Sequence, residues 1–310
     1  MKIIKNLGSL NEDGHQFAVT IGNFDGVHVG HQTILKTILD DCKKDGLELV
    51  VVTFEPHPIQ ILKPRNHFLI NSFTEKRELL RNVGIKYLCE IDFSRDVSTL
   101  TPGSFLDEYI LSCKDVKRIY LGHDFAFGAN KSGDHQFVRE YCQPKNIDVK
   151  LLNEFTLKEK CVSSTKIREA LSLGSVEEVS KMLNRNFFIS GMVVKGEGRG
   201  RKIGFPTANI RFPAERIVPA KGVYITRTQL GDQVWDSLTN IGNNPTFNTG
   251  NDIFVETHIL DFDGNIYGDE ITVEFIKKIR DEKKFESVNH LVDQIKKDEV
   301  LTRDFFRGQR

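Results

Sequence analysis

The chain has 310 residues, long enough for two ordinary domains or one large one. Lysine and arginine number 43, as do aspartate and glutamate, so the formal net charge is zero and no global field recruits nucleic acid or an anionic membrane. The five cysteines are scattered without a C-x-x-C pair, and no window resembles a signal peptide or a membrane span. We therefore expect a cytoplasmic protein without nucleic-acid or membrane partners.

In residues 1–184, short apolar runs alternate with segments of helical period. The expected strands are FAVTIGNF, LELVVVTF, KYLCEIDF, VKRIYLG and IDVKLL, and the expected helices are QTILKTILDDCKK, EKRELLRNVG, PGSFLDEYILSC and HQFVREYC. Two four-residue patterns, Ser72 with Glu75 and Ser175 with Glu178, resemble capping boxes. Strands that alternate with helices predict an α/β domain with a mostly parallel sheet.

Residues 185–310 follow a different pattern. Six runs read as strands: FFISGMVV, TANIRF, GVYITRTQL, VWDSLTNIG, IFVETHIL and ITVEFIKKI. Asp263-Gly264 between the last two is typical of a hairpin. A final helix is expected from Val288 to Val300, with Ser287 as its N-cap. This pattern predicts a six-stranded antiparallel β-barrel with a C-terminal helix.

The string GNFDGVHVGH (22–31) follows the first strong strand, where a parallel sheet binds its ligands. A helix that begins there offers free N–H groups to a phosphate, and glycines such as Gly22 and Gly30 allow the backbone to come close. His28 and His31 are three apart, so both can donate to phosphate oxygens. The alternatives are a metal site, for which Asp25 is the only carboxylate nearby, and an ordinary glycine-rich turn. We favour phosphate.

A second candidate phosphate site is CVSSTKIREAL (161–171), where hydroxyl residues open an amphipathic helix. Ser164 and Thr165 would position a triphosphate, and Arg168 would neutralise part of its charge. The alternative is a helix N-cap followed by solvated cations.

The H-x-G-H string after a strand, together with SSTKIR, resembles the nucleotidyltransferase superfamily that transfers a nucleoside monophosphate from ATP. The longer string GNFDGVHVGH, followed by TFEPHP (53–58) and SSTKIR, resembles one branch of it, the bacterial bifunctional riboflavin kinase and FAD synthetase family.

The second half of the chain tests this resemblance with motifs of its own. In KGEGRGRKIGFPTANI (195–210), a loop rich in glycine and arginine can surround phosphates with backbone amides, although it is not a Walker A loop. Thr207 and Asn209 share one face of the next strand and offer two oxygens to Mg²⁺. The alternative is a flexible surface loop that leads into a polar-faced strand.

Glu256, within IFVETHIL, shares a strand face with Phe254, His258 and Leu260. A carboxylate on such an apolar face is costly unless it is paired or functional. It would suit a base that accepts a proton from an alcohol during phosphoryl transfer. The alternative is a solvated glutamate on an edge strand.

A series of motifs in this half resembles the flavokinase domain in order and spacing. The motifs are the glycine-rich loop with PTAN, then NPTF, VETHILDFDGNIYG and IRDEKKF. The resemblance thus covers nearly the whole chain. It implies an FMN adenylyltransferase domain over residues 1–184 and a riboflavin kinase domain over residues 185–310. It also implies Mg²⁺ as cofactor, ATP as co-substrate, and riboflavin, FMN and FAD as substrates or products. We expect a monomer or a weak homo-oligomer.

The resemblance also implies roles for single residues. In the first domain His28 and His31 would be catalytic, and the nucleotide would be bound by Gly22, Asn23, Phe24, Asp25, Gly30, Ser164, Thr165 and Arg168. In the second, Glu256 would be the catalytic base and Thr207 and Asn209 would hold Mg²⁺. The phosphates there would be covered by Gly196, Gly198, Arg199, Gly200 and Arg201. Flavin would be bound by Asp124 of the first domain and by Asn244, Arg280 and Phe285 of the second.

One position departs from the family pattern: Ala126 stands in LGHDFAFG where an arginine is expected. If that arginine holds flavin or nucleotide, adenylylation would be weaker here. Two rival functions remain, a nucleotidyltransferase for another phosphate-bearing acceptor and a flavin-binding regulator with a degenerate adenylylation site. The PTAN motif argues against the first, and the otherwise intact motifs argue against the second.

Overall fold

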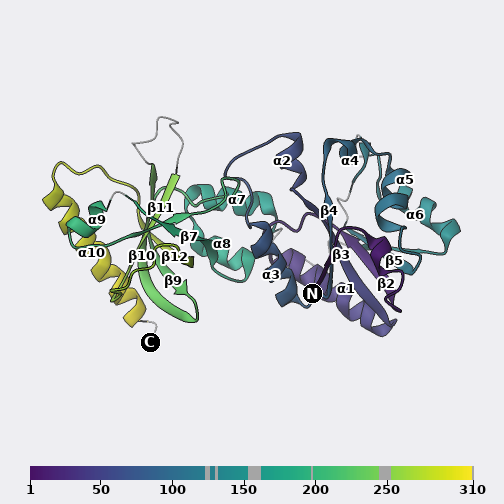
Figure 1. Cartoon of the computed structure of the whole chain (residues 1–310), viewed down its shortest axis with the longest axis horizontal. Coiled ribbons are helices and arrows are strands. Elements are labelled where there is room, and N and C mark those ends of the chain that lie inside the picture. The colour runs from purple at the N-terminus through teal and green to yellow at the C-terminus, as the bar shows by residue number, and fades with distance from the viewer. Residues whose placement is uncertain (123–125, 130–131, 153–161, 197, 244–252, 309–310) are drawn as a thin grey trace. The chain divides into compact units, whose positions relative to one another are not determined.

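The computed structural model describes residues 1–122, 126–129, 132–152, 162–196, 198–243 and 253–308. The chain divides into two compact units, Met1–Ser164 and Thr165–Arg310, which Figure 1 colours from purple to teal and from teal-green to yellow. The helices α7 (Ser164–Leu173) and α8 (Val176–Leu183) fall in the second unit apart from Ser164. The functional boundary between residues 184 and 185 stays a prediction.

The first unit contains a six-stranded parallel sheet in the order β1-β4-β3-β2-β5-β6, which confirms the predicted sheet. Its strands are β1 (Lys2–Ile4), β2 (Gln16–Ile21), β3 (Leu47–Glu55), β4 (Tyr87–Asp92), β5 (Val116–Gly122) and β6 (Asp148–Leu152). Only the three-residue edge strand β1 was not predicted.

Helices cover both faces of this sheet (Figure 1). The side chains of β2 are correspondingly apolar on both faces. Phe17, Val19 and Ile21 are buried in one apolar cluster and Ala18 in the other, as expected for a strand buried on both sides. The α-helices of the unit are α1 (Val29–Lys44), α2 (Pro58–Leu62), α3 (Phe73–Val83), α4 (Arg95–Thr99), α5 (Pro102–Phe105) and α6 (His135–Cys142). Shorter turns are η1 (Leu7–Leu10), the π-helical η2 (Leu106–Ile110) and η4 (Gln143–Lys145).

The strand order places a topological switch point at the carboxyl end of β2. From β2 the chain adds β3 and β4 on one side, and it then returns to add β5 and β6 on the other. Ligands of open α/β sheets bind at such points. The segment 22–28, which joins β2 to α1, lies there.

One of the two predicted capping boxes is confirmed. Ser72 Oγ accepts from Glu75 N at 3.2 Å, and Glu75 Oε2 accepts from Ser72 N at 2.7 Å. The box at Ser175 is wrong, because the side chain of this residue makes no capping hydrogen bond. A tight turn through Gly174 (φ 76°) leaves Ser175 with ψ near 60°, whereas Ser72 has the extended ψ of 167° that a capping side chain needs.

The second unit contains a closed antiparallel barrel in the order β10-β11-β8-β7-β12-β9, as predicted. Its strands are β7 (Phe187–Val194), β8 (Ala208–Arg211), β9 (Gly222–Leu230), β10 (Gln233–Asn243), β11 (Ile253–Ile259) and β12 (Glu270–Arg280). A short helix, α9 (Arg199–Lys202), lies between β7 and β8, and α10 (Val288–Arg307) follows the barrel. As predicted, Ser287 caps α10, accepting from His290 N at 3.3 Å.

The hairpin predicted at Asp263-Gly264 is wrong. β11 pairs with β10 and β8, whereas β12 pairs with β7 and β9. The chain between β11 and β12 therefore crosses to another part of the barrel. The tight hairpin instead joins β9 to β10, where Leu230 is paired with Gln233 across Gly231 (φ 57°).

The barrel interior is partly polar. Five fully buried hydroxyl residues hydrogen-bond to one another at 2.7–3.3 Å: Thr226, Thr228, Ser237, Thr239 and Thr257. These bonds close into a ring, so each hydroxyl has partners although none reaches water. On β11 the interior residues alternate with outward ones, and Glu256 and His258 therefore face outward.

Candidate active sites

The histidines of GNFDGVHVGH lie at the start of α1, as the sequence predicted. His28 is the N-cap residue, and its Nδ1 accepts from His31 N at 3.3 Å. The two imidazole rings stack with centroids 3.7 Å apart and planes 16° apart. Because Nδ1 of His28 accepts this bond, its proton is on Nε2 in the neutral form, which leaves Nε2 as a donor.

His31 has unused hydrogen-bonding capacity. Its Nδ1 is buried and has no hydrogen-bond partner among the described residues, and the Phe24 ring meets the imidazole edge-on at 5.2 Å. Burial lowers the pKa of His31 well below 6.5, and the charges of His28 and Lys76 lower it further. His31 is therefore neutral at pH 7, and a buried polar atom that lacks a partner suits a ligand.

Asp25 anchors the loop before α1. Its buried carboxylate accepts from the backbone N–H groups of Ile70 at 3.0 Å and of Asn71 at 3.4 Å. Ser164 Oγ donates to the carbonyl of Asp25 at 2.9 Å. The structure thus brings the SSTKIR motif, through Ser164, against GNFDG. Thr165 and Arg168 follow on α7, and their contact with a nucleotide stays a prediction.

Lys76, on α3, belongs to the same site and was missed in the sequence. Its Nζ donates to the carbonyl of Asn23 at 3.3 Å and to Thr53 Oγ1 at 3.0 Å. Nothing in EKRELLRNVG distinguishes this lysine from its charged neighbours. Only the packing of α3 on the loop buries it.

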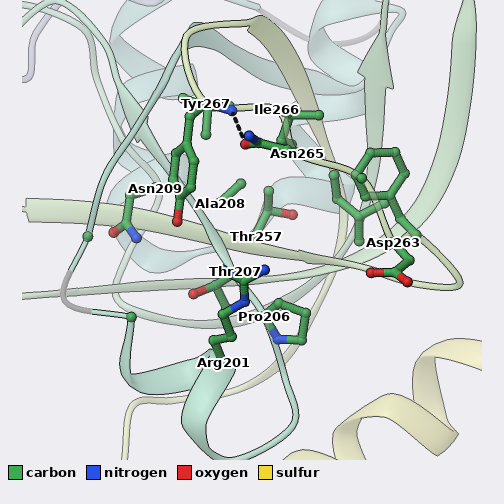
Figure 2. A pocket seen from close by; sticks show the side chains of 16 residues that line it. Arg201, Pro206, Thr207, Ala208, Asn209, Thr257, Asp263, Asn265, Ile266 and Tyr267 are labelled. Carbon is green, nitrogen blue, oxygen red and sulfur yellow. Dashed lines mark hydrogen bonds between the residues drawn. The ribbon is translucent and has the colours of Figure 1, made fainter.

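The barrel carries a cavity of about 260 Å³, shown in Figure 2. Arg201 and Thr207 point into it from one side, and the ring of Tyr267 points into it from the other. The predicted phosphate and metal residues on its wall are Gly196, Gly198, Arg201, Thr207 and Asn209. The predicted residues Arg199 and Gly200 belong to α9 and do not line it.

The glycine-rich loop packs directly on the proposed metal ligands. A Cβ atom added to Gly196 would lie 2.2 Å from Asn209 Nδ2, so only glycine allows this approach. The opposite wall is the crossover segment from Phe262 to Tyr267, in which the Tyr267 N–H donates to Asn265 Oδ1 at 3.3 Å. Because this segment was read as a hairpin, its part in the cavity was missed.

Glu256, the predicted base, is not among the residues that line this cavity, although its strand partner Asn209 is. It is half-buried and pairs in register with Asn209 across β11 and β8, so the two side chains project from the same face of the barrel. Two residues later, His258 Nδ1 lies 2.7 Å from the carbonyl of Pro206, the first residue of PTAN. A carbonyl only accepts, so Nδ1 carries the proton.

The predicted flavin residues are placed only in part. Arg280 lies over the Phe285 ring at 5.8 Å, but its guanidinium is bound to the buried Asp298 by bonds of 2.9 and 2.8 Å. Neither Arg280 nor Phe285 lines the cavity. Asp124 and Asn244 lie outside the described residues, and Ala126 is exposed.

Within the described residues, no group of three or more histidine, cysteine, aspartate or glutamate side chains is arranged to hold a metal ion. The metal alternative for His28 and His31 therefore gains no support. In the same part of the chain, no helix has the length and apolarity needed to cross a membrane.

Two family models match the chain. The riboflavin kinase model matches residues 183–306, and the FAD synthetase model matches residues 10–166. The bifunctional riboflavin kinase/FMN adenylyltransferase of Bacillus subtilis (strain 168) is 33% identical over 311 residues, covering 97% of this chain and 96% of that protein. That of Escherichia coli (strain K12) is 35% identical over 309 residues, covering 99% and 98%.

A crystal structure from Streptococcus pneumoniae, described as a macrolide-efflux protein, has the same fold. It is 34% identical, with a TM-score of 0.85, and the match covers 97% of this chain and 98% of that one. The two family models divide the chain as its two kinds of fold do, and the curated relatives match it along almost its whole length. The chain belongs to the family of bifunctional riboflavin kinase/FMN adenylyltransferases.

Proposed function

We propose that this chain converts riboflavin to FAD in two ATP-dependent steps, phosphorylation in the barrel and adenylylation at the carboxyl end of the parallel sheet. One observation carries the proposal: each unit has its own glycine-rich loop beside groups suited to phosphate. In the first, neutral His31 stands at a helix start with a buried, unpartnered nitrogen. In the second, glycines, Arg201 and Thr207 line one cavity.

In the barrel, the ribityl 5′-hydroxyl of riboflavin attacks the γ-phosphorus of ATP. An oxygen–phosphorus bond forms, the bond from that phosphorus to the β,γ-bridging oxygen breaks, and ADP leaves. Glu256 accepts the hydroxyl proton. Arg201 and the glycine-rich loop bind the phosphates, with Arg199 and Gly200 completing the loop.

Thr207 and Asn209 would hold Mg²⁺ in this cavity. Both offer neutral oxygens, which suit a hard cation that also binds ATP phosphates and keeps some of its waters. When bound, the ion supplies positive charge that neutralises the phosphates. The close packing of Gly196 on Asn209 supports this role, because it fixes the amide beside the loop that covers the phosphates.

In the first unit, a phosphate oxygen of FMN attacks the α-phosphorus of a second ATP. The new pyrophosphate bond of FAD forms as the bond to the β-phosphate breaks, and pyrophosphate leaves. His28 and His31 donate to the phosphates, and the amino end of α1 adds its dipole. The nucleotide pocket is shaped by Gly22, Asn23, Phe24, Asp25 and Gly30, and it is completed by Ser164, Thr165 and Arg168.

We further assign flavin contacts to Asp124, Asn244, Arg280 and Phe285, and we place the reactions in the reducing cytoplasm in a monomer or weak homo-oligomer. The cysteines support a reducing compartment. Cys42, Cys89, Cys113 and Cys142 are free and buried, and burial raises the pKa of each thiol.

Chromatography of flavins during incubation with riboflavin, ATP and Mg²⁺ tests the proposal. FMN should form first and FAD later, and EDTA should stop the first step. FMN without FAD would refute the second step and point to Ala126. No flavin product would refute both steps, and conversion of a different phosphate-bearing acceptor would favour the rival nucleotidyltransferase.

A further inference from the structure

Lys76 is a buried cation in the first unit. Only 5% of its surface is exposed, and its ammonium donates to the carbonyl of Asn23 and to Thr53 Oγ1. Thr53 Oγ1 in turn donates to the same Asn23 carbonyl at 3.3 Å. Helix α3 and strand β3 thus both hold one carbonyl of the loop that leads to His28 and His31.

Lys76 has no ion-pair partner among the described residues. The Phe73 ring lies 4.1 Å from Nζ in a cation–π contact, and the charges of Asp25, Glu90 and Glu55 also favour the ammonium, but none of the described carboxylates lies within 4.0 Å of Nζ. The next residue, Arg77, by contrast donates twice to Glu90, both times at 2.6 Å. Burial of a charge without such a partner is costly, so the position requires a compensating benefit.

The benefit is support for the loop that joins β2 to α1. Asn23 directly follows Gly22 at the end of β2, and the next residue is Phe24, whose ring meets His31 at 5.2 Å. Phe24 has the strained φ of 48°, so its conformation needs support from the packing around it. A fixed Asn23 carbonyl supplies that support one residue away.

We propose that Lys76 is a positioning residue of the adenylylation site, which fixes the Asn23 carbonyl and places a positive charge beneath the loop that binds the ATP phosphates. This inference rests on the function proposed for the first unit. It adds that a side chain of α3 fixes the loop through the Asn23 carbonyl, and that the positive charge of this side chain favours a polyanionic ligand.

The charge of Lys76 is sensitive to pH in the working range. Burial lowers its pKa from 10.5 to about 8, while Asp25, Glu90 and Glu55 raise it and Arg77 lowers it. The charge of Lys76 in turn lowers the pKa of His31. As the pH rises through 8, Lys76 becomes a neutral amine. Its two remaining N–H groups can still hold Asn23 and Thr53, so mainly the charge is lost.

The experiment measures kcat and KM for FAD formation from FMN and Mg²⁺-ATP between pH 6.5 and 9 in the full-length protein. Wild type should lose activity as the pH rises through about 8. Lys76→Met should reduce kcat/KM about 10- to 100-fold at pH 7 and lack this alkaline decline. Thr53→Val removes the hydroxyl that accepts from Lys76 and donates to the Asn23 carbonyl but keeps the charge of Lys76, so it should lose less activity and keep the decline.

Lys36→Met, at an exposed lysine of α1, is the matched control and should behave as wild type. Riboflavin phosphorylation by each variant reports whether the barrel is folded, and thermal unfolding of each variant, compared with wild type, reports whether the first unit is folded. Wild-type FAD formation by Lys76→Met, or a flat wild-type profile from pH 7 to 9, would overturn the role of Lys76. Absence of FAD formation in wild type at every pH would instead refute the proposed function of the first unit.

Discussion

His31 is the residue through which the adenylylation proposal is tested most directly. His31→Ala removes the ring that stacks on His28 and the buried nitrogen that has no partner among the described residues. We expect FAD formation from FMN to fall roughly 10²–10³-fold, the usual effect of losing one donor that stabilises developing charge. Riboflavin phosphorylation in the same protein should be unchanged.

His15→Ala controls for this change, because His15 is exposed just before β2. It should leave both reactions intact. Normal conversion of FMN to FAD by His31→Ala would remove His31 from the mechanism.

Glu256 provides the corresponding test in the barrel. Glu256→Gln keeps the size of the side chain and removes the base, so FMN formation should fall roughly 10²–10⁴-fold with little change in thermal stability. The substitution Glu270→Gln, at the exposed start of β12, is the control. Steady-state FMN formation from riboflavin measures both. Unchanged phosphorylation in Glu256→Gln would exclude Glu256 as the base and leave the fold assignment intact.

At the scale of elements, His258 joins β11 to the PTAN segment. The β8–β11 ladder pairs Glu256 with Asn209 and Thr257 with Ala208. Beyond these pairs, the His258 ring bonds to the Pro206 carbonyl and packs on Phe205 at 5.6 Å. The side chain thus fixes the backbone just before Thr207.

This contact predicts different effects for two substitutions. His258→Leu should raise the KM for Mg²⁺-ATP and lower the rate of FMN formation about 10- to 100-fold, because Thr207 loses its fixed position. His258→Asn should restore much of the activity, since its amide nitrogen can donate from near the position of Nδ1. Equal losses in the two variants, measured as kcat and KM for ATP, would contradict this positioning role.

Most elements could be predicted from the sequence because their signals are local. Alternating β-branched runs marked the five longer strands of the sheet and all six strands of the barrel. Strand partners are not local, and for this reason Asp263-Gly264 was misread as a hairpin although β11 and β12 are not neighbours. The Ser175 pattern failed for a similar reason, since the preceding turn decides its backbone angles.

The same distinction applies to the candidate sites. The motifs predicted where His28, His31, Thr207 and Asn209 would lie, because each motif includes its own helix start or strand. They did not indicate Lys76, which is buried only because α3 packs on a loop that is distant in the sequence. They likewise gave no sign that Arg280 would be held by Asp298 of α10.

At the scale of the whole molecule, the residues proposed as catalytic in each reaction come from one unit, although Thr165 and Arg168, proposed to bind the nucleotide of the first, belong to the second unit. His28, His31 and Lys76 lie within residues 1–164, and Thr207 and Glu256 lie within residues 165–310. A change to one group should therefore stop one reaction without affecting the other, and FMN released by one molecule should serve another.

This modularity predicts that two defective proteins together can complete the pathway. His31→Ala alone should convert riboflavin to FMN and stop, and Glu256→Gln alone should make FAD only from added FMN. An equimolar mixture should form FAD from riboflavin after a lag, because FMN must first accumulate in solution. Chromatography of the flavins over time measures the lag, and added FMN should abolish it. If the mixture makes no FAD although Glu256→Gln still converts added FMN, the FMN made by His31→Ala is not released into solution, and the two sites do not work independently.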